Sequence, residues 1–374
     1  MSAQSAVSDP ASLAPAYVRA IAPYRAGRPI SEVARAYGLD ESKIVKLASN
    51  ENPLGMPDSA RQAMLVAAAD LGRYPDANGF ELKEALSARL GVPQDWLTLG
   101  NGSNDILELV AHAWLQPGLS AVYSQYSFQV YELATQETGA RAIVTPAKDF
   151  GHDLPAMRAA IAPDTRVVFI ANPNNPTGTF LPAAQIEAFL QSVPPHVVVV
   201  LDEAYNEYLE PSLWVDAVAW VKRFPNLVLS RTFSKAYGLA GLRVGYGVAQ
   251  PALTDLMNRV RQPFNVNSMA QAAAVAALAD QPFLQRSRTL NAEGIRLLQT
   301  TFDAMGLQYV PSYGNFVLVK VGDANGVNEK LLKAGVIVRP VGNYGLPEWL
   351  RITVGLPEEN RIFLGALGAA LGRA

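Results

Sequence analysis

The sequence has no cysteine, so disulfide bonds, thiol catalysis and zinc–thiolate sites are excluded. It also has no run near 18 uninterrupted apolar residues, which a membrane-spanning helix would need. The 33 acidic and 31 basic residues nearly cancel, and the net charge of −2 predicts no attraction to nucleic acid or to an anionic membrane. We therefore expect a protein that binds neither nucleic acid nor membrane.

Other familiar patterns are missing too. The first 15 residues have no basic start followed by an apolar core, so they predict no signal peptide; we expect a flexible arm there and a cytoplasmic protein. The three histidines lie far apart and outside every motif described below, so no metal site is expected. There is no GxGxxG pattern, which argues against a nicotinamide-binding α/β protein.

What the sequence does contain is a series of short β-branched runs, apolar on both faces, which predict strands of a covered parallel sheet. The expected strands are residues 96–100, 120–124, 141–145, 166–172, 197–203, 227–231 and 244–248. Helical patterns lie between several of them, at 103–115, 127–139 and 183–192. This alternation predicts an α/β fold whose large domain has a mostly parallel, seven-stranded sheet flanked by helices.

The pattern changes after Pro263. Long helical patterns, three expected strands and a closing helix follow, at 268–280, 283–305, 315–320, 336–339, 350–354 and from about 358. We therefore expect a smaller C-terminal α/β domain, which the N-terminal arm partly joins. The expected boundaries are 1–45 for the arm, 46–265 for the large domain and 266–374 for the small domain.

Three polar motifs follow expected strands, at the sheet edge where open α/β proteins bind ligands. In LGNGSND (99–105), a glycine-bearing turn leads into a helix, and the free N–H groups of Ser103 and Asn104 would suit a phosphate. The same residues would also serve as an ordinary helix cap. ANPNNPTG (171–178) is compatible with a plain turn, and Asp202 in LDEAY with a helix N-cap.

The segment SRTFSKAYGLAGLRVGY (230–246) places Lys235 among hydroxyls and small residues, with Arg243 eight positions later. A buried lysine is costly unless its charge is consumed, and burial lowers its pKa, which suits a nucleophile. Pyridoxal phosphate needs a lysine for a Schiff base, a carboxylate at its pyridinium nitrogen, donors to its phenolate oxygen and a cationic, hydroxyl-lined phosphate site. The ordered set of motifs therefore predicts this cofactor.

The same set resembles the fold-type-I aminotransferases, and within them the group that acts on histidinol phosphate. The resemblance runs from LASNENPLG (47–55) and RYPD (73–76) to LRITVG (350–355), and it covers nearly all of the chain beyond the first 15 residues. It implies an enzyme of histidine biosynthesis that exchanges amino groups between glutamate and imidazole acetol phosphate. Histidinol phosphate and 2-oxoglutarate are the substrates of the reverse direction.

The resemblance also implies roles for individual residues. Lys235 is expected to form the Schiff base and then to carry protons, and Asp202 to pair with the pyridinium nitrogen. Asn175 and Tyr205 are expected to hydrogen-bond the phenolate oxygen. The cofactor phosphate is expected to be held by Ser103, Asn104, Thr232, Ser234 and Arg243.

Five more residues follow from the resemblance. Tyr126 resembles the aromatic residue that stacks on the cofactor ring, although SQYSFQVY lacks the proline common in that segment and core packing is an equal alternative. Tyr74 resembles a residue that reaches the neighbouring subunit's cofactor phosphate, which implies a homodimer with shared active sites. Arg351 is expected to bind the substrate α-carboxylate and Arg339 the substrate phosphate, with Tyr24 as a further contact.

Alternatives remain open. The motifs also fit an aromatic amino-acid aminotransferase, and a threonine-phosphate decarboxylase would share the fold. A non-catalytic regulator with an aminotransferase-like domain would need a DNA-binding helix-turn-helix, for which the first 45 residues are too short and too little basic. The sequence does not decide between histidinol phosphate and aromatic amino acids.

Overall fold

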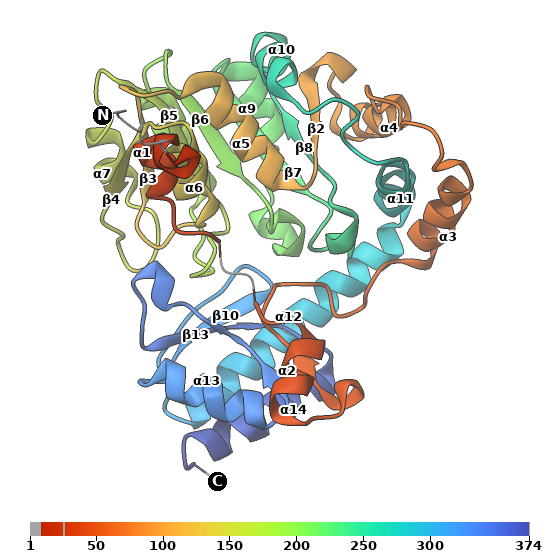
Figure 1. Cartoon of the computed structure of the whole chain (residues 1–374), viewed down its shortest axis with the longest axis vertical. Coiled ribbons are helices and arrows are strands. Elements are labelled where there is room, and N and C mark those ends of the chain that lie inside the picture. Colours follow the sequence, from red (N-terminus) through yellow and green to blue (C-terminus); the bar gives the residue numbers. More distant parts are fainter. Residues whose placement is uncertain (1–8, 25–26, 374) are drawn as a thin grey trace, which may run out of the picture.

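A computed structural model describes residues 9–24 and 27–373, which form two α/β units (Figure 1). Residues 1–8 of the expected flexible arm lie outside the described residues, and η1 (Pro10–Leu13) and α1 (Ala16–Arg19) follow them. In the part of the chain that the structure describes, no helix is long and apolar enough to cross a membrane.

The first unit, called the large unit below, is built on a seven-stranded sheet in the order β2-β8-β7-β6-β5-β3-β4. Its strands are β2 (Leu97–Gly100), β3 (Ser120–Ser124), β4 (Arg141–Thr145), β5 (Thr165–Ala171), β6 (Val198–Asp202), β7 (Leu227–Thr232) and β8 (Gly245–Val248). Only β8 runs antiparallel to its neighbours β2 and β7, and the remaining pairs are parallel. The predicted mostly parallel sheet of seven strands is therefore confirmed.

Alternate residues of the central strands enter two separate cores, one on each face of this sheet. In β5, Val167 and Phe169 pack in one core, and Val168 and Ile170 pack in the other. Because both faces are covered, these strands carry valine and isoleucine at successive positions rather than at every second one. The first face is covered by α5 (Ser103–Trp114), α6 (Val130–Glu137) and α10 (Pro251–Val260), and the second by α3 (Asp58–Ala67), α4 (Phe80–Leu90), α7 (Leu154–Ala159), α8 (Ala183–Ser192) and α9 (Ala217–Arg223).

The second unit, called the C-terminal unit below, has a four-stranded antiparallel sheet in the order β12-β13-β10-β9. Its strands are β9 (Tyr309–Val310), β10 (Phe316–Lys320), β12 (Arg339–Pro340) and β13 (Trp349–Thr353). Three helices pack on it: α12 (Gln281–Ala304), α13 (Ala324–Lys333) and α14 (Pro357–Ala370). Helix α12 runs diagonally from the large unit to this sheet (Figure 1).

The N-terminal residues contribute to the C-terminal unit. Strand β1 (Val45–Lys46) pairs in parallel with β11 (Val336–Ile337), and the side chains of α2 (Ile30–Tyr37) pack against Leu332 and Ile337. Leu47 continues the contact, because its carbonyl accepts a hydrogen bond of 2.9 Å from the N–H of Thr353. The segment that follows therefore enters the space between the two units from the C-terminal side.

Helix α11 (Ser268–Ala279) differs from the expected division of the chain. The expected small domain begins at residue 266, but Ala270, Ala273 and Ala277 are buried in the core of the large sheet. The helix is alanine-rich, so it packs closely and its sequence has no strongly apolar stripe that would indicate a partner. The chain passes from the large unit to the C-terminal unit along α12 instead. Leu284, near the start of this helix, packs in the core of the large unit, and Leu298 packs in the core of the C-terminal unit.

Candidate active site

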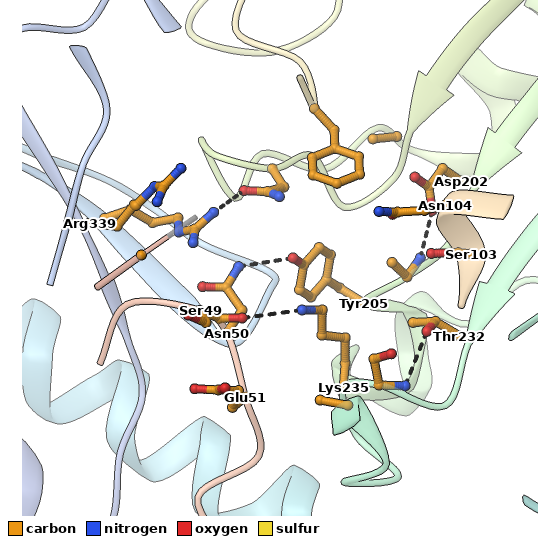
Figure 2. A pocket seen from close by; sticks show the side chains of 18 of the residues that line it. Ser49, Asn50, Glu51, Ser103, Asn104, Asp202, Tyr205, Thr232, Lys235 and Arg339 are labelled. Carbon is orange, nitrogen blue, oxygen red and sulfur yellow. Dashed lines mark hydrogen bonds between the residues drawn. The ribbon is translucent and has the colours of Figure 1, made fainter. Parts of the chain in front are cut away.

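A cavity of about 370 Å³ lies between the two units, at the carboxyl ends of β5, β6 and β7 (Figure 2). Parallel strands end at this edge, and the helix that follows β2 begins there, so polar side chains from several motifs converge. The cavity is lined by all but two of the predicted site residues, namely Tyr24, Ser103, Asn104, Asn175, Asp202, Tyr205, Thr232, Ser234, Lys235, Arg243, Arg339 and Arg351. Tyr74 and Tyr126 are the two that do not line it.

One end of the cavity has the donors that an anion requires. Helix α5 begins at Ser103, so its first N–H groups are free of helical partners. Gly102 has φ +85°, and a Cβ there would lie 2.5 Å from Nη2 of Arg243. A Cβ on Gly245 would lie 2.6 Å from the Ser103 nitrogen. Only glycines therefore let the guanidinium and β8 approach the helix start so closely.

Arg243 is fixed at this end of the cavity by its own hydrogen bonds. Its Nη1 donates to the Ala240 carbonyl at 3.0 Å and to Ser234 Oγ at 3.3 Å, and its Nη2 donates to the Asn101 carbonyl at 3.1 Å. Thr232 Oγ1 lies on the neighbouring strand end and accepts the N–H of Ser234 at 3.1 Å. Helix N–H groups, hydroxyls and a guanidinium form a combination typical of phosphate sites.

Asp202 ends β6 and is buried at the centre of the cavity wall. Burial raises the pKa of this carboxyl to about 6, although two hydrogen bonds oppose the rise. The hydroxyl of Tyr131 donates to Oδ2 at 2.9 Å, and the N–H of Ala204 donates to Oδ1 at 3.2 Å. The carboxylate is therefore held in one orientation and suits a cationic ring nitrogen as partner.

Lys235 projects from the segment after β7, and its Nζ donates to the Ser49 carbonyl at 3.3 Å (Figure 2). Burial, together with the nearby charge of Arg351, lowers the pKa of this amine to about 8. The ammonium also lies 5.9 Å from the centre of the Tyr205 ring. With a pKa of about 8, roughly a tenth of Lys235 is neutral at pH 7, and this neutral amine is the nucleophilic form.

Asn175 and Tyr205 face the cavity from the loops after β5 and β6. The Oδ1 of Asn175 accepts a hydrogen bond of 2.6 Å from Nη1 of Arg351, so the amide offers its NH₂ group to a ligand. The Tyr205 hydroxyl accepts a hydrogen bond of 2.9 Å from Nδ2 of Asn50, and burial raises the pKa of this phenol to about 12. Both side chains can therefore donate to an anionic oxygen in the cavity.

The two predicted substrate arginines lie opposite each other on neighbouring strands, since Arg339 of β12 pairs in register with Arg351 of β13. Arg351 is only 7% exposed, and burial lowers the pKa of its guanidinium. Its Nη2 donates to the Ala48 carbonyl at 2.8 Å. Arg339 lies over the ring of Tyr24, 5.9 Å from its centre. Two guanidinium groups thus face the cavity from the C-terminal unit.

Of the two alternatives for Tyr126, the structure agrees with core packing and not with stacking in the site. Tyr126 adopts φ +56° and turns away from the cavity, and its ring stacks on Phe150 at 6.0 Å between centroids. The ring that lines the cavity is that of Phe128, two residues later. Two aromatic residues in one short segment carry no local signal that tells which of them turns inward.

Tyr74 also lies outside the cavity of its own chain. It is 79% exposed and its ring stacks on Phe264, with 4.3 Å between centroids. Its expected reach into a neighbouring subunit stays a prediction. The sequence reasoning also missed Ser49, Asn50 and Glu51, which line the cavity although the motif LASNENPLG contains them.

Residues 42–367 match the protein family described as "Aminotransferase class I and II". The chain belongs to this family, so the resemblance to fold-type-I aminotransferases that the motifs predicted is confirmed.

The chain is also similar to one particular kind of aminotransferase within this family. The chain is 70% identical to histidinol-phosphate aminotransferase 1 of Cupriavidus pinatubonensis, over 96% of each chain. It is 67% identical to histidinol-phosphate aminotransferase 2 of Ralstonia nicotianae, over 96% of this chain and 97% of that one. The crystal structure of histidinol-phosphate aminotransferase from Sinorhizobium meliloti in complex with pyridoxal-5'-phosphate is similar with a TM-score of 0.87 and 29% identity, over 96% of this chain and 97% of that one.

Proposed function

We propose that the chain is a pyridoxal-phosphate-dependent aminotransferase that converts histidinol phosphate and 2-oxoglutarate to imidazole acetol phosphate and glutamate, in histidine biosynthesis. One observation carries this proposal: a lysine of lowered pKa lines the same cavity as a buried carboxylate, a phosphate cradle and two arginines. The names of the relatives at 67% and 70% identity support the choice of substrate.

The residues present fit pyridoxal phosphate. The cradle of Ser103, Arg243 and the neighbouring hydroxyls suits its phosphate, and the close approaches at Gly102 and Gly245 would be blocked by any Cβ. Asp202 is a buried carboxylate with a raised pKa, so a cationic partner would lower its free energy. Phe128 offers a ring face within the same cavity.

Bound pyridoxal phosphate supplies an aldehyde that condenses with amines and a protonated pyridine ring that withdraws electrons from the substrate's α-carbon. Asp202 would keep the ring nitrogen protonated, and Asn175 and Tyr205 would donate hydrogen bonds to the phenolate oxygen. Lys235 Nζ is the base: as a free amine it accepts a proton from the substrate carbon and, as an ammonium, it returns a proton. The site uses no histidine for this transfer.

Two different anions must bind in turn at the substrate end, because glutamate carries an α-carboxylate where histidinol phosphate carries a phosphate ester. A planar guanidinium accepts either anion, so Arg351 and Arg339 can serve both half-reactions. Their register on paired strands brings both forks to one wall of the cavity. An aromatic donor such as phenylalanine offers them a monoanionic carboxylate, whereas histidinol phosphate offers a phosphate dianion.

A substrate comparison tests the proposal. The purified protein should be yellow, and its kcat/KM should be higher for histidinol phosphate than for phenylalanine with 2-oxoglutarate as acceptor. A preference for phenylalanine would assign the chain to the aromatic aminotransferases, and a colourless protein that binds no pyridoxal phosphate would contradict the whole assignment.

A homodimer with shared active sites, located in the cytoplasm, is part of the same proposal. The Tyr74 ring is exposed and is held against Phe264, and a side chain that contacts another subunit's site needs such an exposed position. Inactive Lys235→Ala subunits mixed with inactive Tyr74→Ala subunits should then regain activity, because one site of each hybrid has both wild-type groups. A monomer that is fully active at nanomolar concentration would exclude shared sites.

A further inference from the structure

Asn50 lines the cavity and has an unusual backbone conformation for a buried residue. It is 1% exposed and adopts φ +55°, a left-handed conformation that few residues other than glycine and asparagine adopt readily. No role was assigned to it from the sequence. Its backbone and its amide together make hydrogen bonds to three partners, and these bonds determine which way its side chain is turned.

The orientation of the Asn50 amide follows from its bonds to Thr353. The backbone N–H of Asn50 can only donate, and it donates to Oγ1 of Thr353 at 2.9 Å. The hydroxyl of Thr353 in turn donates to Oδ1 of Asn50, at 3.1 Å. Because Oδ1 faces Thr353, the NH₂ group of the amide must face Tyr205, which lies 2.9 Å from Nδ2.

This orientation in turn determines the direction of the Tyr205 proton. The phenol oxygen accepts the N–H of Asn50, so the phenol cannot donate its own proton to the Asn50 amide. Tyr205 lines the cavity, and its proton is therefore available to an acceptor there. Under the proposed function, that acceptor is the phenolate oxygen of the cofactor.

We propose that Asn50 is a positioning residue that directs the Tyr205 hydroxyl proton toward the cofactor. This inference rests on the proposed function. A donor to the phenolate oxygen stabilises its negative charge, and that charge is least compensated when the adjacent imine nitrogen has lost its proton. A Tyr205 that donates into the cavity therefore lowers the pKa of that nitrogen, and a Tyr205 turned the other way does not.

The position of Asn50 adds a second point. Its carbonyl accepts a hydrogen bond of 3.0 Å from Nδ2 of Asn315, so the residue is bound to the C-terminal unit by its backbone as well as by its amide. Tyr205 belongs to the large unit. The Asn50–Tyr205 hydrogen bond is therefore a connection between the units, and Thr353 lies two residues after Arg351 on β13.

The test exchanges the donor for an acceptor. In Asn50→Asp, a carboxylate oxygen replaces the NH₂ group, and the Tyr205 proton should turn to it. Aspartate tolerates the left-handed backbone as asparagine does. The measurement is the pH midpoint of the absorbance change of bound pyridoxal phosphate, in wild type, Asn50→Asp, Tyr205→Phe and the double variant.

The double variant separates the proton's direction from the new charge. The negative charge of Asn50→Asp should raise the pH midpoint of the absorbance change both with Tyr205 and with Tyr205→Phe. Only the protein that retains Tyr205 has a phenol proton that the new carboxylate can also redirect. We expect the shift caused by Asn50→Asp to be larger by about one pH unit in the Tyr205 background, the effect of one lost hydrogen bond. The other ionisable groups that act on Tyr205 or Lys235 are the same in all four proteins, namely Glu51, Asp202, Arg243, Tyr344 and Arg351.

Thr353 gives an uncharged version of the test that does not depend on how well the Asn50→Asp protein folds. Thr353→Val removes the hydroxyl that orients the amide and should raise the midpoint, whereas the conservative Thr353→Ser should retain the wild-type value. Equal shifts of Asn50→Asp in the two backgrounds, or equal midpoints in the Val and Ser variants, would overturn the inference. Absence of cofactor absorbance in the wild type would instead overturn the proposed function.

Discussion

The two ends of the cavity hold their arginines in different ways. Arg243, at the phosphate cradle, is exposed and lies on a loop, where three hydrogen bonds fix its guanidinium. Arg351, at the opposite end, is buried on β13 and shares its donors between Asn175 and the Ala48 carbonyl.

The difference matches the ligands that the two ends are proposed to bind. Every group of the cradle comes from the large unit, so the cradle can hold a permanent cofactor in one position. The guanidinium groups of the substrate end come from the C-terminal unit, and Tyr24 comes from the N-terminal residues. Anions that exchange in every turnover are thus contacted by a separate part of the molecule.

The largest expected effect is at the cofactor end. Lys235→Ala should abolish transamination with every substrate, because both the attachment point and the base are lost, while the cradle can still retain the cofactor without a covalent bond. Borohydride reduction of the wild type, followed by peptide mapping, should find the cofactor on Lys235. Lys83 is a matched control, since burial also lowers its pKa but it lies outside the cavity, and Lys83→Ala should stay active. Cofactor found on another lysine would refute the assignment.

The next effect concerns Asp202, whose carboxyl has a folded-state pKa of about 6, above its usual value. In the cofactor-free protein it is ionised only above that pH, so affinity for pyridoxal phosphate should fall as the pH drops through about 6. Asp202→Asn should bind the cofactor, lose most activity and lack this pH step. Fluorescence titration of wild type and Asp202→Asn with the cofactor checks this prediction from pH 5 to pH 8, which covers about one unit or more on each side of the step. Protonation of the cofactor's own phosphate affects both proteins equally, so it does not account for a difference between them. The same step in both proteins would remove Asp202 from the binding equilibrium.

The smallest effects are expected at the substrate end, where two arginines bind the substrate anion together. Loss of a charge-assisted contact costs about 1.5–3 kcal/mol, roughly a tenfold to hundredfold loss of kcat/KM. Arg351→Ala should reduce both half-reactions by this factor. Arg339→Ala should reduce kcat/KM for histidinol phosphate more than for phenylalanine. An equal loss for both donors would count against the histidine-pathway assignment.

Much of the large unit could be predicted from the sequence because its signals are local. A strand such as β6 is a run of valines followed by an aspartate, and parallel topology brings all such strand ends to one edge. The positions of Lys235 and Asp202 follow from that rule, and Arg243 lies at the same edge because it lies just before the antiparallel strand β8. Helix α11 could not be assigned in this way, because an alanine-rich helix fits either unit and only tertiary packing decides.

The missed residues depend on contacts that no short window contains. Phe128 rather than Tyr126 lines the cavity because Tyr126 takes a left-handed backbone and stacks on Phe150, 24 positions away by number. Asn50 is oriented by Thr353, which is 303 residues away in the chain. Neither contact leaves a periodic or compositional signal in the sequence.

The pairing of β1 with β11 also has a consequence for the order in which the protein can be completed during synthesis. Val45 and the segment after it leave the ribosome early, but Val336 and Thr353, which hold that segment in place, are made near the end of the chain. Contacts between residues so far apart form slowly, because a long loop must close first. The large sheet can therefore be assembled while the cavity still lacks one wall, and we expect a nascent chain released before β13 to contain Lys235 but no finished site for a substrate.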